Sequence, residues 1–212
     1  MEYGRSVEKL TGETIAEGLA QAREYNKALA ELPLSDPFSA GESALPEGYA
    51  SILNTGNSVM GSVEIPRISV NLPIYHGTSP QVLEKGVGHM EMTPFPIGGK
   101  GSHAVLTGHT GLPSARMFTD LNQLEEGDLF YIRIYKETAV YRVDQISVVL
   151  PSDTALLRPE AGKDYVSLVT CTPYGVNSHR LLVRGTRVPS GDAGASQPQQ
   201  PKGGQGNAPM VQ

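Results

Sequence analysis

YVSLVTCTPYGVNSHRLLVRGTRV, residues 165–188, contains two apolar runs on either side of a short polar loop. The first run is Tyr165–Cys171 and the second is His179–Val188, and the loop between them holds a proline and a glycine. This pattern is typical of two antiparallel strands joined by a turn. Similar runs lie earlier in the chain, at residues 62–75, 104–108, 129–135 and 139–150. Closely spaced runs of this kind predict a mainly β domain, either a sandwich or a closed barrel.

The composition supports a folded domain and excludes several classes of protein. Hydrophobic residues make up 39% of the 212-residue chain, and 24 glycines with 16 prolines favour short strands and turns over long helices. The net charge of −5 argues against a protein that binds nucleic acid or anionic membranes, because such proteins carry basic surfaces. The single cysteine, Cys171, excludes an internal disulfide framework and a cysteine-rich metal site.

The chain divides into four segments. Residues 6–32 show a helical spacing of apolar side chains, with glycines that suit two short helices as well as one. The segment 33–57 is too long for an ordinary connection, so it is predicted to be either a functional lid or a disordered linker. The strands lie in residues 58–188, and a disordered tail is predicted for residues 189–212. No apolar run reaches the ~18 residues of a membrane span, so we expect a soluble part of a longer protein.

Cys171 is the first candidate for catalysis, because it stands at the end of a predicted strand, where a rigid scaffold can expose a reactive side chain. Arg180 opens the next strand. If the two strands pair as a hairpin, the thiol and the guanidinium lie at the same end of the sheet. The arginine would then favour the reactive thiolate or stabilise an oxyanion. The alternative is a buried structural cysteine beside a surface arginine.

His109 is the second candidate, because it lies between two Thr-Gly pairs directly after a predicted buried strand. A histidine on such a turn can serve as general acid or base, since its ordinary pKa is close to neutral pH. The other histidines have weaker claims because they lie in turns, at a strand start or on the face opposite Arg180: His76, His89, His103 and His179. The alternative for any single histidine is a polar residue with only a structural role.

Three segments resemble the histidine, cysteine and arginine motifs of sortases, the transpeptidases of Gram-positive cell surfaces. They are LTGHTG (106–111), LVTCTPYG (168–175) and HRLLVRG (179–185). The resemblance extends from about Ser62 to Val188 and includes VEIPRI (63–68) and GVGHM (86–90). The sequence EYNKAL (24–29), followed by DPF (36–38), is similar to class C, the pilin-polymerising sortases. This resemblance implies a closed β-barrel of about eight strands, with an N-terminal helical segment and a lid loop.

The resemblance also implies a role for each motif residue. Cys171 would be the nucleophile, His109 the general acid and base, and Arg180 the group that stabilises the substrate and the transition state. The cysteine motif often begins with threonine, and here Ser167 stands at that position, which keeps a hydroxyl group on the strand.

The lid implied by the class C resemblance consists of Asp36, Pro37 and Phe38. Asp36 would face Arg180, and Phe38 would rest on Cys171. The proline fixes the backbone, so that the acidic and aromatic side chains project in defined directions. An aspartate can pair with the guanidinium, and a phenyl ring can exclude water from the thiol. The alternative is that Asp-Pro-Phe forms an ordinary loop turn.

The implied substrate is a Leu-Pro-X-Thr-Gly sorting signal, cleaved between threonine and glycine, and the implied partners are pilin subunits with an acceptor lysine. No metal or organic cofactor is expected. Thr170, Thr172 and Tyr174 are candidates for the peptide-binding groove, because they lie next to Cys171 along the chain. The implied location is the extracytoplasmic face of a Gram-positive cell membrane, with the full-length protein anchored there and this chain as a soluble ectodomain.

Three other functions remain as alternatives at this point. A cysteine hydrolase would use the same residues but resolve the intermediate with water. A housekeeping sortase would attach proteins to peptidoglycan, and the Asp-Pro-Phe segment argues against it. A non-catalytic surface β-domain would keep Cys171 as a structural residue.

Overall fold

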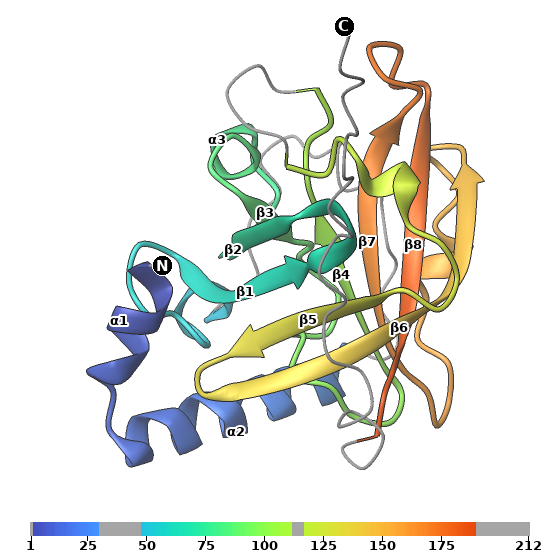
Figure 1. The fold of residues 1–212 in the computed structure, drawn as a ribbon. Coiled ribbons are helices and arrows are strands. Elements are labelled where there is room, and N and C mark those ends of the chain that lie inside the picture. The colour runs from blue at the N-terminus through green and yellow to red at the C-terminus, as the bar shows by residue number, and fades with distance from the viewer. Residues whose placement is uncertain (1, 30–47, 112–116, 190–212) are drawn as a thin grey trace, which may run out of the picture.

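Eight strands close into one β-barrel in the order β1-β2-β3-β4-β7-β8-β6-β5 (Figure 1). This computed structural model describes residues 2–29, 48–111 and 117–189. The strands are β1 Val59–Ile65, β2 Val70–His76, β3 Val87–His89, β4 Ser102–Thr107, β5 Leu129–Ile134, β6 Glu137–Val149, β7 Asp164–Thr172 and β8 His179–Arg187. The mainly β fold with a closed barrel, predicted from the sequence, is therefore confirmed.

The barrel interior is filled by every second side chain of each strand, as the two-residue period of a strand requires. On β7, Val166 and Leu168 face the main core, where they pack with Leu181 and Val183 of β8. The alternate residues of the same strands face outward, where Val169 and Leu182 belong to a second, smaller apolar cluster. One side of β7 and β8 therefore fills the barrel, and the other side contributes Val169 and Leu182 to a second buried cluster.

Strand β7 is paired along both edges. It runs parallel to β4, from Ser102 opposite Asp164 to Thr107 opposite Val169. It runs antiparallel to β8, with eight residue pairs between Tyr165 and Thr172. The C-terminal end of β4, the C-terminal end of β7 and the start of β8 consequently meet at one end of the barrel.

The apolar run at residues 62–75 forms two strands instead of one. It breaks at Pro66, the first residue of a 3-10 turn over Pro66–Ile68, and Ser69 then adopts a left-handed backbone with φ of 54°. Proline suits the first position of such a turn, because its φ is already fixed near the helical value. The strands β1 and β2 on either side pair as an antiparallel hairpin.

Two helices, α1 Glu2–Glu8 and α2 Gly12–Ala28, precede the barrel. The short helix α3 Pro80–Leu83 lies later in the chain, between β2 and β3. Thr11 separates the first two, and its hydroxyl accepts a hydrogen bond from the Thr14 amide at 3.2 Å as an N-cap. The helical segment thus begins earlier than the expected residue 6, and α2 ends at Ala28.

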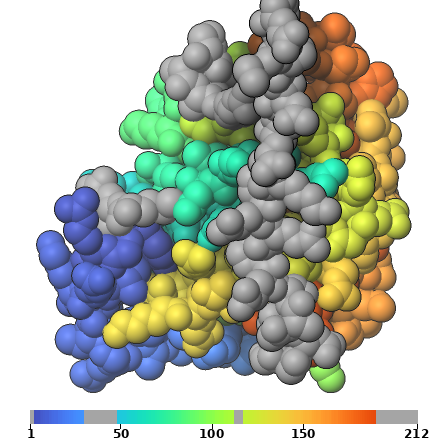
Figure 2. All heavy atoms as spheres, viewed as in Figure 1, coloured from blue at the N-terminus to red at the C-terminus, as the bar shows by residue number. Residues whose placement is uncertain are grey.

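Both helices pack against the β5–β6 hairpin (Figure 2). The Tyr3 hydroxyl of α1 donates to the Met60 carbonyl at 3.1 Å and accepts from the Tyr135 amide at 2.6 Å. Gly18 of α2 is buried, and a Cβ at this position would overlap the Tyr135 hydroxyl. The missing side chain of Gly18 therefore permits the close approach of α2 to the hairpin turn, which explains a glycine inside a helix.

A buried aromatic cluster anchors the segment that begins at residue 48. Tyr49 is fully buried, and its ring stacks on Phe95. The Tyr49 hydroxyl lies 2.8 Å from His89 Nδ1, and His89 Nε2 lies 2.9 Å from the Pro94 carbonyl oxygen. Because a carbonyl oxygen can only accept, Nε2 carries the proton and Nδ1 accepts from the tyrosine. His89 is thus a neutral core residue.

The expected lid and tail fall largely outside the described residues. The residues outside the described ranges include Asp36, Pro37 and Phe38 and the segment 190–212. Neither α1, α2 nor α3, the α-helices of the described ranges, has the length and hydropathy of a membrane-spanning helix.

Removing the Tyr3 hydroxyl should destabilise the protein. Tyr3→Phe leaves a buried amide and a buried carbonyl without their partner, so we expect the free energy of unfolding to fall by about 2 kcal/mol. Urea denaturation measures this change, with Tyr75→Phe on the partly exposed face of β2 as control. Equal stability of the Tyr3 variant and the unmodified protein would contradict the anchoring role of this hydroxyl.

Candidate functional site

Cys171 and Arg180 lie directly opposite each other on β7 and β8. Side chains of directly opposed residues in an antiparallel pair project from the same face of the sheet. Val169 and Leu182 are the next pair on this face, and both belong to the outer apolar cluster. Cys171 is partly exposed. The thiol and the guanidinium therefore lie at the exposed end of one surface, as the hairpin pattern in the sequence predicts.

The Arg180 guanidinium is oriented by the loop that joins β7 to β8. Its Nη1 donates to the Asn177 and His179 carbonyl oxygens, each at 3.1 Å. Asn177 adopts a left-handed backbone with φ of 59°, which turns the chain before β8 begins. Arginine remains protonated at any physiological pH, so this end of the barrel carries a fixed positive charge beside Cys171.

His109 enters the same end of the barrel from β4. The parallel pairing of β4 with β7 ends at Thr107, and the Gly108 amide then donates to the Val169 carbonyl at 3.0 Å. His109 is half-buried, and this burial lowers the pKa of its imidazole, while the Glu84 carboxylate acts in the opposite direction. The neutral imidazole, which can accept a proton, is favoured near neutral pH.

The peptide group before His109 is held from several sides. The Thr170 hydroxyl donates to the Gly108 carbonyl at 2.7 Å, and the Phe118 amide donates to the His109 carbonyl at 3.0 Å. The Phe118 ring lies so close to Gly108 that a Cβ there would approach it to 2.7 Å. The three catalytic candidates are therefore brought to one end of the barrel by strand pairing and local hydrogen bonds.

The three predicted groove residues differ in exposure. Thr170 is buried, and its hydroxyl is bonded to the turn before His109. Thr172 is partly exposed at the end of β7. Tyr174 is 67% exposed, and its ring lies against Gly111, where a Cβ would come within 2.9 Å. Tyr174 thus joins the β7–β8 loop to the turn that carries His109.

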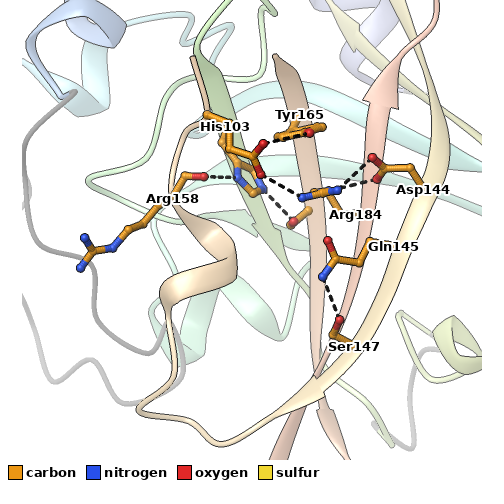
Figure 3. A network of polar contacts seen from close by, with 9 residues as sticks. His103, Asp144, Gln145, Ser147, Arg158, Tyr165 and Arg184 are labelled. Carbon is orange, nitrogen blue, oxygen red and sulfur yellow. Dashed lines mark hydrogen bonds and ion pairs between the residues drawn. The ribbon is translucent and has the colours of Figure 1, made fainter. Parts of the chain in front are cut away.

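A polar network on the same outer face was not predicted from the sequence (Figure 3). Arg184 lies opposite Ser167, four residue pairs along the strands from Arg180 and Cys171, and this even spacing places it on the same face. Its guanidinium donates through Nε and Nη2 to the two carboxylate oxygens of Asp144, each at 3.0 Å, and lies 4.1 Å above the centre of the Tyr165 ring. The four-residue spacing of the two arginines along β8 was the available signal for a second charged position on this face.

His103 connects this network to the segment between β6 and β7. Its Nδ1 lies 3.0 Å from the Arg158 carbonyl oxygen and its Nε2 lies 2.8 Å from the Ser167 hydroxyl (Figure 3). The carbonyl can only accept, so Nδ1 carries the proton and the serine donates to Nε2. A small pocket opens beside this contact, lined by Gln145, Ser147, Leu156, Ser167, Leu182 and Arg184.

Metal binding has no support in the described ranges, since no group of three or more His, Cys, Asp or Glu side chains gathers there as a metal site would require.

Asp36, Pro37 and Phe38 lie outside these ranges, so their relation to Cys171 and Arg180 stays a prediction.

Known sortases are similar to this chain in sequence and in structure. Residues 63–188 match the sortase domain. Sortase D of Bacillus subtilis (strain 168) is 29% identical over 182 residues, which is 84% of each chain. Sortase C-1 from Actinomyces oris is 49% identical, with a TM-score of 0.79 over 83% of this chain and 99% of that one. Streptococcus pneumoniae sortase C, studied for its pilin substrate specificity, is 39% identical, with a TM-score of 0.82 over 89% and 95% of the two chains.

Acidification should destabilise the fold through its buried histidines. Burial lowers the pKa of His103 to about 4 and that of His89 to about 3, whereas an unfolded histidine titrates near 6.5. As the pH falls below 6.5, the unfolded chain takes up protons that the folded chain does not, so the free energy of unfolding decreases. Between pH 6.5 and 5 we expect a loss of about 2 kcal/mol for each of the two histidines.

Urea denaturation at pH 7 and pH 5 measures this loss. His103→Asn should reduce the pH dependence, because the contribution of His103 is lost while those of His89 and of His76 and His109, whose pKa values are also lowered by burial, remain. A free energy of unfolding that is equal at the two pH values in the unmodified protein would disprove the assignment of two neutral buried histidines.

Proposed function

The chain belongs to the sortase family of cysteine transpeptidases, and we propose that it joins pilin subunits through their sorting signals. Support for pilins as substrates comes from the similar sortases C, among them the Streptococcus pneumoniae enzyme described for its pilin substrate specificity. The observation that carries the proposed chemistry is the pairing of Cys171 with Arg180, at the barrel end where β4 delivers His109.

In the first proposed step, neutral His109 takes the proton of the Cys171 thiol, and the resulting thiolate attacks the threonine carbonyl carbon of a Leu-Pro-X-Thr-Gly signal. The carbonyl oxygen becomes an oxyanion, and the Arg180 guanidinium stabilises its charge. The C–N bond to glycine then breaks as protonated His109 gives a proton to the leaving amine. The products are a thioester between Cys171 and threonine and a free peptide that begins with glycine.

In the second proposed step, the amine of a lysine on another pilin subunit attacks the thioester carbonyl carbon. Neutral His109 accepts the proton that the amine loses, and the Cys171 thiolate leaves as the new amide bond forms. Both steps use the same three side chains, and the proton that His109 gives in the first step is recovered in the second. The reaction as proposed needs no metal or organic cofactor.

The sorting signal is proposed to bind as an extended peptide on the outer face of β7 and β8. Val169 and Leu182 follow Cys171 and Arg180 on this face but are buried in the second apolar cluster, so the proposed contact surface lies at the exposed end of the strands. Tyr174 and Thr172 border this surface on the side of the β7–β8 loop. The pocket beside Arg184 lies farther along the same face.

The lid is a second part of the proposal. Asp36 would pair with the Arg180 guanidinium and Phe38 would cover the Cys171 thiol, with Pro37 fixing their directions. We further propose that the protein acts on the extracytoplasmic face of a Gram-positive membrane, anchored there in its full-length form.

The transfer reaction tests the proposed function. The protein is mixed with a Leu-Pro-X-Thr-Gly peptide and a lysine-bearing acceptor peptide, and the products are identified by mass. We expect the joined peptide from the unmodified protein and none from Cys171→Ala. Arg180→Lys should lower the rate at least 10-fold, because a point charge cannot replace the planar guanidinium. Hydrolysed peptide without joined product would instead identify a hydrolase, and no cleavage by the Phe38→Ala protein would refute the proposal.

The lid is tested by the reactivity of the thiol. Asp36→Ala and Phe38→Ala should each increase the rate of Cys171 alkylation by iodoacetamide several-fold, since they uncover the sulfur. Thermal unfolding should change little, because the sequence predicts that the substituted residues belong to a loop outside the barrel. If neither variant changes the alkylation rate, the lid is absent and the three catalytic assignments are unaffected.

A further inference from the structure

We infer that Thr170 is a positioning residue that holds His109 in place for proton transfer, an inference that rests on the proposed function. Thr170 directly precedes Cys171 on β7, and Gly108 directly precedes His109 after β4. The Thr170 hydroxyl donates to the Gly108 carbonyl at 2.7 Å, between residues 62 positions apart in the chain. One side-chain hydrogen bond therefore connects the neighbours of the nucleophile and of the general acid and base.

The connection is specific because Gly108 is bonded on both sides. Its amide donates to the Val169 carbonyl at 3.0 Å, so Val169 and Thr170 hold the two peptide groups that flank Gly108. A glycine has wide backbone freedom, and here the nearby Phe118 ring excludes any larger residue. The two hydrogen bonds restrict rotation at the residue from which the His109 backbone continues.

Direct contact of Thr170 with the peptide substrate fits the structure less well. Thr170 is only 3% exposed, and by strand alternation its side chain projects from the face of β7 opposite Cys171. A threonine hydroxyl has one proton, and the Gly108 carbonyl accepts it. Thr170 thus acts on the reaction through the backbone of the His109 turn.

The effect on catalysis follows from the geometry of proton transfer. A general acid must reach the leaving amine at hydrogen-bond distance, and a displacement of about 1 Å can cost about 100-fold in rate. Without the threonine hydroxyl, the Gly108 carbonyl loses its buried donor, and the peptide group between Gly108 and His109 can rotate. His109 should then spend less time in its productive position, while the peptide-binding surface is unchanged.

The test compares Thr170→Val, which removes the donor with little change of shape, with Thr170→Ser, which keeps it. Thr93→Val is the control for the loss of a buried threonine hydroxyl, because the Thr93 hydroxyl donates to the Met90 carbonyl at the same distance of 2.7 Å and accepts from the Val105 amide at 3.3 Å, without a bond to Gly108. Thr170→Ala repeats the comparison without the second methyl group of valine. The rate constant of thioester formation, the KM for the signal peptide and the pH dependence of the rate are measured for each variant.

We expect Thr170→Val to lower the rate at saturating peptide by about 10- to 100-fold, to leave KM within about twofold and to shift the pH dependence. Thr170→Ser should restore most of the rate, and Thr93→Val should keep it. An unchanged rate and pH profile in both Thr170→Val and Thr170→Ala would overturn the inference, as would an equal loss in Thr93→Val.

A second measurement does not depend on turnover. The titration of the His109 imidazole, followed by NMR without peptide, should change in Thr170→Val and not in Thr93→Val. If the unmodified protein forms no thioester, the proposed function fails, and the His109 titration alone then decides whether Thr170 holds the turn. Identical titrations in all variants would exclude the positioning role.

Discussion

The hydrogen-bonded pairing of β7 along both of its edges is the constraint on which the site depends. The antiparallel edge places Arg180 opposite Cys171, and the parallel edge carries β4 to the same end of the barrel, where His109 follows. Because side chains alternate along a strand, the same pairing divides β7 into a face that fills the barrel and a face that bears the cysteine. Core residues and the proposed nucleophile therefore alternate along one strand, in which Leu168 faces the barrel interior and Cys171 the opposite side.

Local patterns allowed much of this arrangement to be predicted. The apolar runs indicated the strands β5 and β6 and, with the turn residues between them, the β7–β8 hairpin, which was enough to place Arg180 beside Cys171. The parallel pairing of β4 with β7 could not be derived from local patterns, because it joins strands with a long crossover between them. The position of the break at Pro66 could not be fixed from the run 62–75 alone, since a proline is compatible with a strand end as well as with a turn.

Side-chain partners were harder to predict than strands. Arg184 obtains its partner Asp144 from β6, and His103 obtains the Arg158 carbonyl from the segment before β7, so both contacts join residues that are far apart in the chain. Thr170 shows a different difficulty. Its place next to Cys171 in the chain suggested a groove residue, whereas the two-residue period of a strand directs neighbours to opposite faces. Nearness along a strand is a poor guide to nearness in a site.

The closed barrel limits how an extended peptide can bind beside Cys171. Many peptide-binding domains add their ligand as an extra strand at an open sheet edge, where backbone bonds give affinity with little regard to sequence. Beside Cys171 that route is closed, because β4 and β8 already occupy the two edges of β7. A bound segment must then be recognised through its side chains, which lie across the surface of the barrel. These side-chain contacts supply the affinity, and the same contacts distinguish one short motif from another.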